Sequence, residues 1–294
     1  MSSSQTHLYS REGAYIPRVA AVHDLCGYGK CSLGVAIPVL SAAGCDVCPV
    51  PTGLFSSHTA FPGWYMHDTT DILADYLAAW NGIGVEIDAV YSGFLGAPEQ
   101  VDRIRDLYAT FPKALRVVDP VMADHGAVYP TYTPELCDAM ADLASSADVL
   151  TPNLTEAAII LGEPIGEEWG GTDIDDAEAE RLVKALGARG AKNVVLKGIQ
   201  REGETCIRNF VGNAEGVVAE VHNEYLPYML HGTGDVYASC LLAAIMAGRS
   251  LEEAAAFAGD FVHDAMIVSA QQPEFQARGV SFEPLLGKVS ALLA

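Results

Sequence analysis

The chain has 294 residues, of which 50% are hydrophobic and 19% are charged, and this composition predicts a globular protein with a large core. Its formal charge of −21 excludes broad contact with nucleic acid, because such contact relies on Lys and Arg side chains to neutralise phosphates. Any phosphate site must therefore be local. We expect a single domain over residues 1–294, with a polar extension over residues 1–17.

The seven cysteines do not form the even framework of a disulfide-rich secreted domain. No uncharged apolar stretch reaches the ~18 residues of a membrane span, and the polar start of the chain lacks the apolar core of a signal peptide. These features predict a cytoplasmic protein with reduced thiols and no membrane partner. Cys45 and Cys48 lack a second pair at metal-finger spacing, so we interpret them as strand packing.

The first predicted strand covers residues 18–25, and it leads through the glycine turn CGYGKC into an apolar helical pattern over residues 32–43. The turn matches neither a dinucleotide fingerprint, which needs a third glycine at Ser32, nor a P-loop. Open α/β sheets bind ligands at the carboxyl ends of their strands. Asp24, at this strand end, is therefore either a ligand contact or a cap for the approaching helix.

A second strand is predicted over residues 46–50, followed by a long loop over residues 51–64 that is rich in Ser, Thr, His and aromatic side chains. Such a loop suits a flat heteroaromatic ligand, because it offers both stacking groups and hydrogen-bond donors. His58 in this loop is either a ligand contact or an ordinary surface histidine.

Strands and helices then alternate along the chain. The predicted helices cover residues 71–80, 99–110, 177–186, 251–270 and 282–293, and the predicted strands cover residues 89–93, 116–119, 148–150 and 193–198. An antiparallel pair with a turn near residues 212–216 is expected within 205–222, and the acidic stretch 163–176 indicates a solvated loop. This pattern predicts an α/β fold whose mostly parallel sheet is covered on both faces.

Polar side chains follow several of these strands, so that Asp24, Asp119, Asn153 and Glu156 are expected at one rim of the sheet. Asn153 and Glu156 stand three residues apart where a helix begins, and they form either a helix cap or part of an oxygen-rich site. In the second interpretation Glu156 and Asp119 are ligands for Mg²⁺. Lys197, near the end of a strand, is either a charge for nucleotide phosphates or a solvated lysine.

Residues 231–240 read HGTGDVYASC, and small and apolar residues continue after them for three helical turns. The pattern predicts a glycine turn that opens a buried helix. The start of such a helix binds anions, because its first N–H groups lack intrahelical partners and the helix dipole adds positive charge. Asp235 is then either a favourable acid of the first helical turn or a group that accepts a proton beside the anion.

These motifs, taken in their order, resemble those of the ribokinase-like vitamin kinases. The resemblance runs from about Val19 to about Ala270, and it rests on GTGD at 232–235, TPN-x-x-E at 151–156, and DPV at 119–121 followed by Asp124. FSSHT at 55–59 is similar to the substrate loop of the pyridoxal kinase branch. The chain departs from that branch in four places: Asp24 for serine, Ser57 for asparagine, Ala123 for glycine, and a short segment 124–134 where a lid is expected.

The resemblance implies a three-layer α/β/α ribokinase-like fold and a homodimer. It also implies transfer of phosphate from ATP, with Mg²⁺, to the 5′-hydroxymethyl group of pyridoxal, pyridoxamine or pyridoxine. The corresponding catalytic residues are Asp235 as base and Gly232, Thr233 and Gly234 as anion hole. The residues that correspond to nucleotide contacts are Asn153, Lys197, Asp119 and Thr233. Those that correspond to metal contacts are Glu156 and Asp119. Those that correspond to substrate contacts are Asp24, His58, Thr59 and Phe94.

Two alternatives to a vitamin B6 kinase remain at this point. One is a hydroxymethylpyrimidine kinase, because HDLCGYG at 23–29 also resembles the corresponding turn of those enzymes. The other is a non-catalytic protein that binds the vitamer on the same scaffold. The preferred vitamer and any role of a monovalent cation are left open by the sequence.

Overall fold

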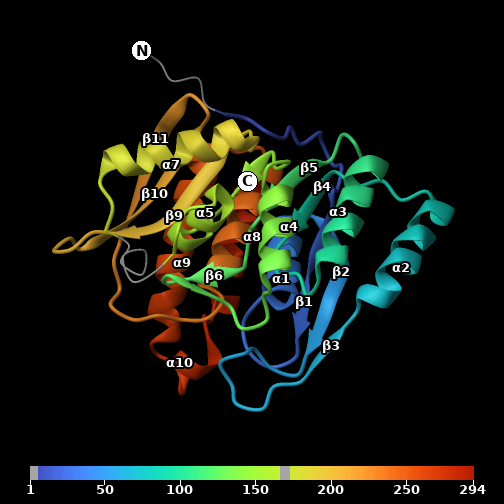
Figure 1. Cartoon of the computed structure of the whole chain (residues 1–294), viewed down its shortest axis with the longest axis horizontal. Helices are drawn as coiled ribbons and strands as arrows, with labels where there is room; N and C mark the ends of the chain where they lie inside the picture. Colours follow the sequence, from blue (N-terminus) through green and yellow to red (C-terminus); the bar gives the residue numbers. More distant parts are fainter. Residues whose placement is uncertain (1–5, 166–172) are drawn as a thin grey trace. The chain divides into compact units, whose positions relative to one another are not determined.

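A computed structural model of the chain describes residues 6–165 and 173–294, and the chain divides into two compact units (Figure 1). We call Thr6–Leu115 with Leu226–Ala294 the flanking unit, and Arg116–Tyr225 the central unit. Half of the predicted loop at 163–176, namely residues 166–172, lies outside the described residues. Within the described ranges, no helix combines the length and the apolar character needed to cross a bilayer.

The flanking unit contains four strands in the order β4-β1-β2-β3. Their bounds are Arg18–Cys26 for β1, Asp46–Phe55 for β2, Met66–Asp68 for β3 and Ala89–Ser92 for β4. β1 pairs in parallel with both β2 and β4, whereas β3 is antiparallel to the end of β2. The centre of β1, from Val19 to Val22, is buried because a parallel strand between two others has both faces covered.

Helices cover this part of the sheet on two sides, and Figure 1 shows α2 and α3 in front of it and α1 and α8 behind it. The bounds are Leu33–Ala42 for α1, Thr70–Ile83 for α2, Pro98–Thr110 for α3, Thr233–Met246 for α8 and Leu251–Ser269 for α9. α8 packs against both α1 and α9, and every residue from Val236 to Met246 is buried. This confirms the predicted buried helix after the glycine turn.

Two predictions in the flanking unit need correction. β2 continues to Phe55, so the predicted loop 51–64 is partly strand. The predicted helix 282–293 is a series of short turns instead, consisting of a 3₁₀ turn at Glu283–Leu285, α11 at Leu286–Ser290 and a 3₁₀ turn at Ala291–Leu293. Gly287 lies inside this stretch, and glycine weakens a helix interior by about 1 kcal/mol. A further short helix, α10, covers Phe275–Arg278.

The central unit has its own strands in the order β11-β10-β9-β8-β5. The bounds are Leu115–Val118 for β5, Val149–Leu150 for β8, Val194–Gln200 for β9, Cys206–Asn213 for β10 and Gly216–Glu224 for β11. β5, β8 and β9 run parallel, whereas β9, β10 and β11 are antiparallel neighbours. The predicted antiparallel pair is therefore confirmed.

The helices of the central unit are α4 (Pro134–Ala144), α5 (Leu154–Leu161) and α7 (Asp176–Arg189). Sequence analysis missed α4, although Thr133 caps it by accepting a hydrogen bond from the Leu136 N–H at 3.2 Å and Pro134 occupies its first turn. The segment expected to form a lid begins with a two-stranded hairpin, β6 (Ala123–Asp124) and β7 (Ala127–Val128). His125 and Gly126 make its turn with φ of 48° and 75°.

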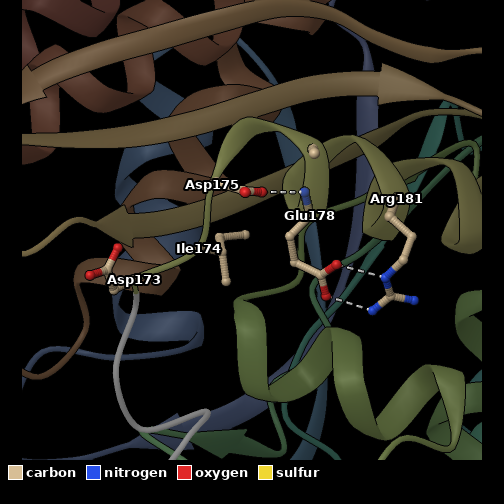
Figure 2. A pocket seen from close by; sticks show the side chains of 6 residues that line it. Asp173, Ile174, Asp175, Glu178 and Arg181 are labelled. Carbon is tan, nitrogen blue, oxygen red and sulfur yellow. Dashed lines mark hydrogen bonds and ion pairs between the residues drawn. The ribbon is translucent and has the colours of Figure 1, made fainter.

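The start of α7 borders a hollow lined by Asp173, Ile174, Asp175, Ala177, Glu178 and Arg181 (Figure 2). Asp175 caps the helix by accepting a hydrogen bond from the Glu178 N–H at 2.8 Å. The Glu178 carboxylate in turn accepts hydrogen bonds from the Arg181 guanidinium, at 2.8 Å from Nε. Asp175 therefore serves as a helix cap, and Glu178 pairs with Arg181 on the same helix. None of the predicted site residues lines the hollow.

Candidate active site

The turn that follows β1 meets the start of α8 in the flanking unit. Gly232 has a φ of 85°, and a Cβ at this position would lie 1.8 Å from the carbonyl oxygen of Lys30. Only glycine fits here, because the backbone of the turn occupies the space of a side chain. The N–H groups of the first turn of α8 point out of its N-terminus, as expected for an anion site. Thr233 turns its hydroxyl back to donate to the Leu230 carbonyl at 3.3 Å.

A segment far along the chain holds this glycine turn in place. The Val280 N–H donates a hydrogen bond to the carbonyl oxygen of His231 at 3.0 Å. A Cβ at Gly279 would lie 2.7 Å from the same oxygen, so the two backbones are in close contact. The predicted anion hole is therefore fixed by residues after α9 as well as by the turn after β1.

Asp24 lies at an irregularity of β1, because the pairing of β1 with β2 shifts register between His23 and Leu25. Such a bulge aims a side chain in a direction that regular strand alternation does not give. The Asp24 carboxyl is only 5% exposed, and it accepts a hydrogen bond from the Ser32 hydroxyl. Burial raises its pKa to about 6, with the Ser32 hydrogen bond opposing the rise.

Asp235 stands in the first turn of α8 and is half-buried. Its charge, together with that of Asp24, raises the pKa of the Cys31 thiol, after the larger effects of a hydrogen bond with Cys26 and of burial. Both carboxylates therefore act on the thiol that ends the turn after β1. The structure brings the predicted base and one predicted substrate residue to the same end of β1.

His58 lies between two rings, with centroid separations of 4.5 Å to Phe61 and 4.7 Å to His231. Its Nε2–H donates to the Ala277 carbonyl at 2.9 Å, and its Nδ1 accepts from the Ala60 N–H at 3.3 Å. Burial and the neighbouring His231 lower its pKa, which favours the neutral ring that this bonding requires. Both ring nitrogens of His58 are thus hydrogen-bonded within the protein. His58 is connected to the glycine turn by the contact between its ring and that of His231.

The other two predicted substrate residues are placed differently. Phe94 is buried and meets Phe55 edge to face at 5.6 Å, while its carbonyl accepts a hydrogen bond from the Thr52 hydroxyl at 2.8 Å. Phe55 also contacts Trp64 at 5.7 Å, so aromatic rings gather beside the end of β1. Thr59 is exposed. The rings can stack on a planar ligand, whereas nothing in the structure assigns Thr59 such a contact.

A second group of predicted residues lies in the central unit, and we call Asp119, Asn153, Glu156 and Lys197 the carboxylate–lysine cluster. Asp119 is fully buried; its Oδ1 accepts a hydrogen bond from the Thr151 hydroxyl at 2.8 Å and forms an ion pair with Lys197. Its other oxygen, Oδ2, has no hydrogen-bond partner among the described residues. A buried carboxylate oxygen of this kind suits a cation or another donor.

Asn153 and Glu156 form a capping box at the start of α5. The Asn153 side chain accepts from the Glu156 N–H at 2.8 Å, and Glu156 accepts from the Asn153 N–H at 2.8 Å. The capping interpretation is therefore confirmed. Burial raises the pKa of Glu156, an effect that Lys197 opposes and Asp119 reinforces. Among the described residues, no group of three His, Cys, Asp or Glu side chains is arranged to hold a metal ion.

Several residues of these sites carry no signal in the sequence. Ser32, Ala277 and Val280 act on Asp24, His58 and His231 through contacts that arise only in the fold. Thr151 is an exception, because it is the first residue of the TPN motif. That motif was singled out in the sequence for Asn153, and the hydrogen bond from Thr151 to Asp119 is seen only in the structure.

Comparison with known proteins places the chain in a family. A family model described as phosphomethylpyrimidine kinase matches residues 39–279, which is most of the chain. The chain belongs to the phosphomethylpyrimidine kinase family. It is therefore a small-molecule kinase, in agreement with the prediction from the motif order.

Individual relatives in and around the family carry two different names. A hydroxymethylpyrimidine/phosphomethylpyrimidine kinase of Haemophilus influenzae is 32% identical over 58% of this chain, and the match spans only 61% of that relative. A pyridoxal kinase, PdxY, of Pasteurella multocida is 27% identical over 88% of this chain and 91% of its own length. A Bacteroides thetaiotaomicron protein named as a phosphomethylpyrimidine kinase has been solved in a crystal form with pyridoxal. That structure superposes with a TM-score of 0.87 at 34% identity, covering 94% of this chain and 96% of that one, which confirms the predicted α/β fold.

Proposed function

We propose that the chain transfers the terminal phosphoryl group of ATP to the 5′-hydroxymethyl group of a B6 vitamer. The observation that carries the proposal is the placing of Asp235 directly after a glycine turn that accepts no side chain, at the same end of β1 as the buried Asp24. The name of the Pasteurella multocida relative and the pyridoxal in the Bacteroides thetaiotaomicron structure support a pyridine alcohol as acceptor.

The proposed chemistry assigns each group of the flanking unit a role. Phosphoryl transfer has a loose transition state, so positioning and charge stabilisation matter more than a strong base. Asp235 accepts the hydroxyl proton of the acceptor as the new oxygen–phosphorus bond forms. The N–H groups of residues 232–235 hold the oxygens of the group in transfer. Asp24, buried at the irregularity of β1, hydrogen-bonds a polar group of the acceptor ring.

In the central unit, the proposal assigns the nucleotide to the carboxylate–lysine cluster. Lys197 offers a positive charge for phosphate oxygens. Its backbone N–H donates to the carbonyl of Pro152 at 2.9 Å, and Pro152 directly precedes Asn153 at the start of α5. Asp119 and Glu156 would hold Mg²⁺, which when bound neutralises phosphate charge. The fit of these residues rests on the orphaned Oδ2 of Asp119 and on the preference of Mg²⁺ for one or two carboxylates with water.

Hydroxymethylpyrimidine is the second candidate acceptor. The family name and the Haemophilus influenzae relative favour it, as does Asp24 in place of serine. A pyrimidine with an exocyclic amine offers donors to a carboxylate, whereas the pyridine ring of a B6 vitamer offers a phenol and a ring nitrogen. Both acceptors are flat primary alcohols, so the aromatic rings around Phe55 suit either.

A single experiment separates these acceptors. ADP release is measured with pyridoxal, pyridoxamine, pyridoxine and hydroxymethylpyrimidine in parallel, each with Mg²⁺ and ATP. We expect kcat/KM for the preferred vitamer to exceed that for hydroxymethylpyrimidine. The opposite ratio would assign the pyrimidine as substrate. Absence of ADP release with all four, combined with calorimetric binding of pyridoxal, would make the chain a binder and overturn the proposal.

We also propose that the two units form one kinase domain, that the enzyme is a homodimer and that it acts in the cytoplasm. The match along most of the pyridoxal kinase relative supports the single domain. The seven cysteines are all free thiols, which fits a reducing compartment. Light scattering of the purified protein tests the dimer.

A further inference from the structure

A buried amide connects three segments of the flanking unit. Gln100 lies in the first turn of α3, and its side chain is fully buried. Its Oε1 accepts a hydrogen bond from the Gly96 N–H at 2.8 Å. Its Nε2 donates to the Thr52 carbonyl and to the Thr70 hydroxyl, both at 2.8 Å. Because one end of the amide faces a donor and the other end faces acceptors, its orientation is fixed.

This amide reaches both ends of the arm, as we call residues 53–68, which comprise the end of β2, the connection that follows and β3. Thr52 directly precedes the arm, and Asp68 is its last residue. The Asp68 carboxylate accepts a third hydrogen bond from the same Nε2, at 3.3 Å. The arm carries Phe55 and Trp64, whose ring centroids lie 5.7 Å apart. A single side chain therefore holds the base of a segment that is rich in aromatic rings.

The third segment covers residues 93–97 between β4 and α3, and we call it the β4–α3 loop. The Thr52 hydroxyl donates to the Phe94 carbonyl of this loop at 2.8 Å, in addition to the hydrogen bond that the amide accepts from the loop. The Phe94 ring in turn meets Phe55 of the arm edge to face at 5.6 Å. Thr52 and Gln100 together therefore fix how the aromatic rings of the arm and of the loop lie relative to each other.

We propose that Thr52 and Gln100 are positioning residues for the acceptor alcohol. They hold Phe94 of the β4–α3 loop against Phe55 of the arm, and so they shape the aromatic surface on which the flat ring of the acceptor stacks. The anion site is formed by other elements, namely the turn after β1 and the start of α8, so the two residues act on the acceptor and not on the phosphate groups. The identity of the acceptor rests on the proposed function.

Thr52→Val tests this role with a small change, because it removes one hydroxyl and keeps the branched shape of the side chain. Thr52→Ser retains the hydroxyl. Thr69→Val is the matched control, because Thr69 is 2% exposed and its hydroxyl also donates to a backbone carbonyl, that of Pro51, at 2.6 Å. Each valine variant loses one buried hydroxyl hydrogen bond, so both should show a similar decrease in the urea midpoint of unfolding.

Gln100→Glu tests the amide itself. Glutamate keeps an oxygen for the Gly96 N–H, but it replaces the donor with a second oxygen that faces the oxygens of Thr52 and Asp68. The hydrogen bonds to both ends of the arm are then lost. We therefore expect Gln100→Glu to weaken acceptor binding in the same way as Thr52→Val.

Binding of pyridoxal and of hydroxymethylpyrimidine to each protein is measured by calorimetry, and the KM values for ATP and for the better alcohol are measured by ADP release. Because the stacking of an aromatic pair corresponds to as much as ~10-fold in affinity, we expect Kd and KM for the preferred alcohol to rise by ~10-fold in Thr52→Val and in Gln100→Glu. The KM for ATP should keep its wild-type value in both. Thr52→Ser and Thr69→Val should retain the wild-type Kd and KM for the alcohol.

A wild-type Kd in Thr52→Val or in Gln100→Glu would overturn the positioning role. An equal loss of affinity in Thr69→Val would also overturn it, because the loss would then reflect stability alone. Binding of an alcohol to the wild type without ADP release would overturn the proposed function only, and the calorimetric comparison of Thr52→Val with Thr69→Val would still decide the role of Thr52. A wild-type protein that binds neither alcohol would overturn both.

Discussion

Replacing Gly232 with alanine tests whether the anion site depends on the close contact between the turn after β1 and α8. The new Cβ would lie 1.8 Å from the Lys30 carbonyl oxygen. To reach an ordinary contact of about 3.5 Å, the two backbones must separate by roughly 1.7 Å. The φ of 85° adds a left-handed conformation, which costs about 1–2 kcal/mol for a residue with a side chain.

Gly248→Ala is the matched control. Gly248 follows the same helix and has a φ of 89°, but a Cβ there meets no atom within 4 Å. It therefore carries the left-handed cost of about 1–2 kcal/mol without a steric clash. Because loss of a preorganised N–H donor costs ~100- to 1000-fold in rate, we expect kcat/KM of Gly232→Ala to fall by ~100-fold or more. Gly248→Ala should keep the wild-type rate.

Both variants are assayed for ADP release and for the midpoint of urea unfolding. Gly232→Ala should unfold at a lower urea concentration than Gly248→Ala, since it carries the clash in addition to the conformational cost. A wild-type rate in Gly232→Ala would refute the reasoning. An equal loss of rate in both variants would also refute it, because the steric contact would then contribute nothing.

Three further predictions concern the carboxylates. Asp235→Asn should lower kcat by ~100- to 10,000-fold with calorimetric ADP affinity unchanged, and near-normal turnover would remove it as the base. Glu156→Gln keeps a side chain that can cap α5. It should raise the Mg²⁺ concentration for half-maximal rate by ~10-fold or more, and an unchanged titration would exclude Glu156 from the metal site. The pKa of Asp24 is raised from 3.8 to about 6 on folding, so its contribution to stability is present below pH 4 and is lost as pH rises through 6. Between pH 3 and 7 the unfolding free energy of the wild type should therefore fall by about 3 kcal/mol relative to Asp24→Asn, and parallel pH curves would contradict this.

The sequence was sufficient where local pattern and spacing decide the structure. The alternation of strands and helices predicted the mostly parallel sheet, and Asn153 with Glu156 predicted the cap of α5. The predicted end of β2 at residue 50 was wrong, because β2 continues through Pro49 and Pro51 to Phe55. Proline is rare inside sheets because it has no N–H to donate to a neighbouring strand. β3 pairs with β2 only from Gly53 to Phe55, so neither proline removes a hydrogen bond to β3.

The environment of the candidate site was largely beyond prediction from sequence. The bulge that aims Asp24 depends on the register of β1 against β2, which no local pattern specifies. His58 was a possible ligand contact, yet its ring is bonded to Ala277, 219 residues away. A contact at that separation leaves no periodicity to detect. The hydrogen bond from the Val280 N–H to the His231 carbonyl likewise leaves no periodicity in the sequence.

The dependence of the glycine turn on Ala277 to Val280 has a consequence for biosynthesis. A nascent chain that has emerged only as far as α9 contains every residue of the HGTGD motif but lacks the backbone that fixes His231. The anion site should therefore mature only after residues 277–280 have been made, later than β1, β2 and β4 of the flanking unit. A released, truncated chain that ends near residue 270 is accordingly expected to carry the α/β scaffold without an ordered phosphate turn.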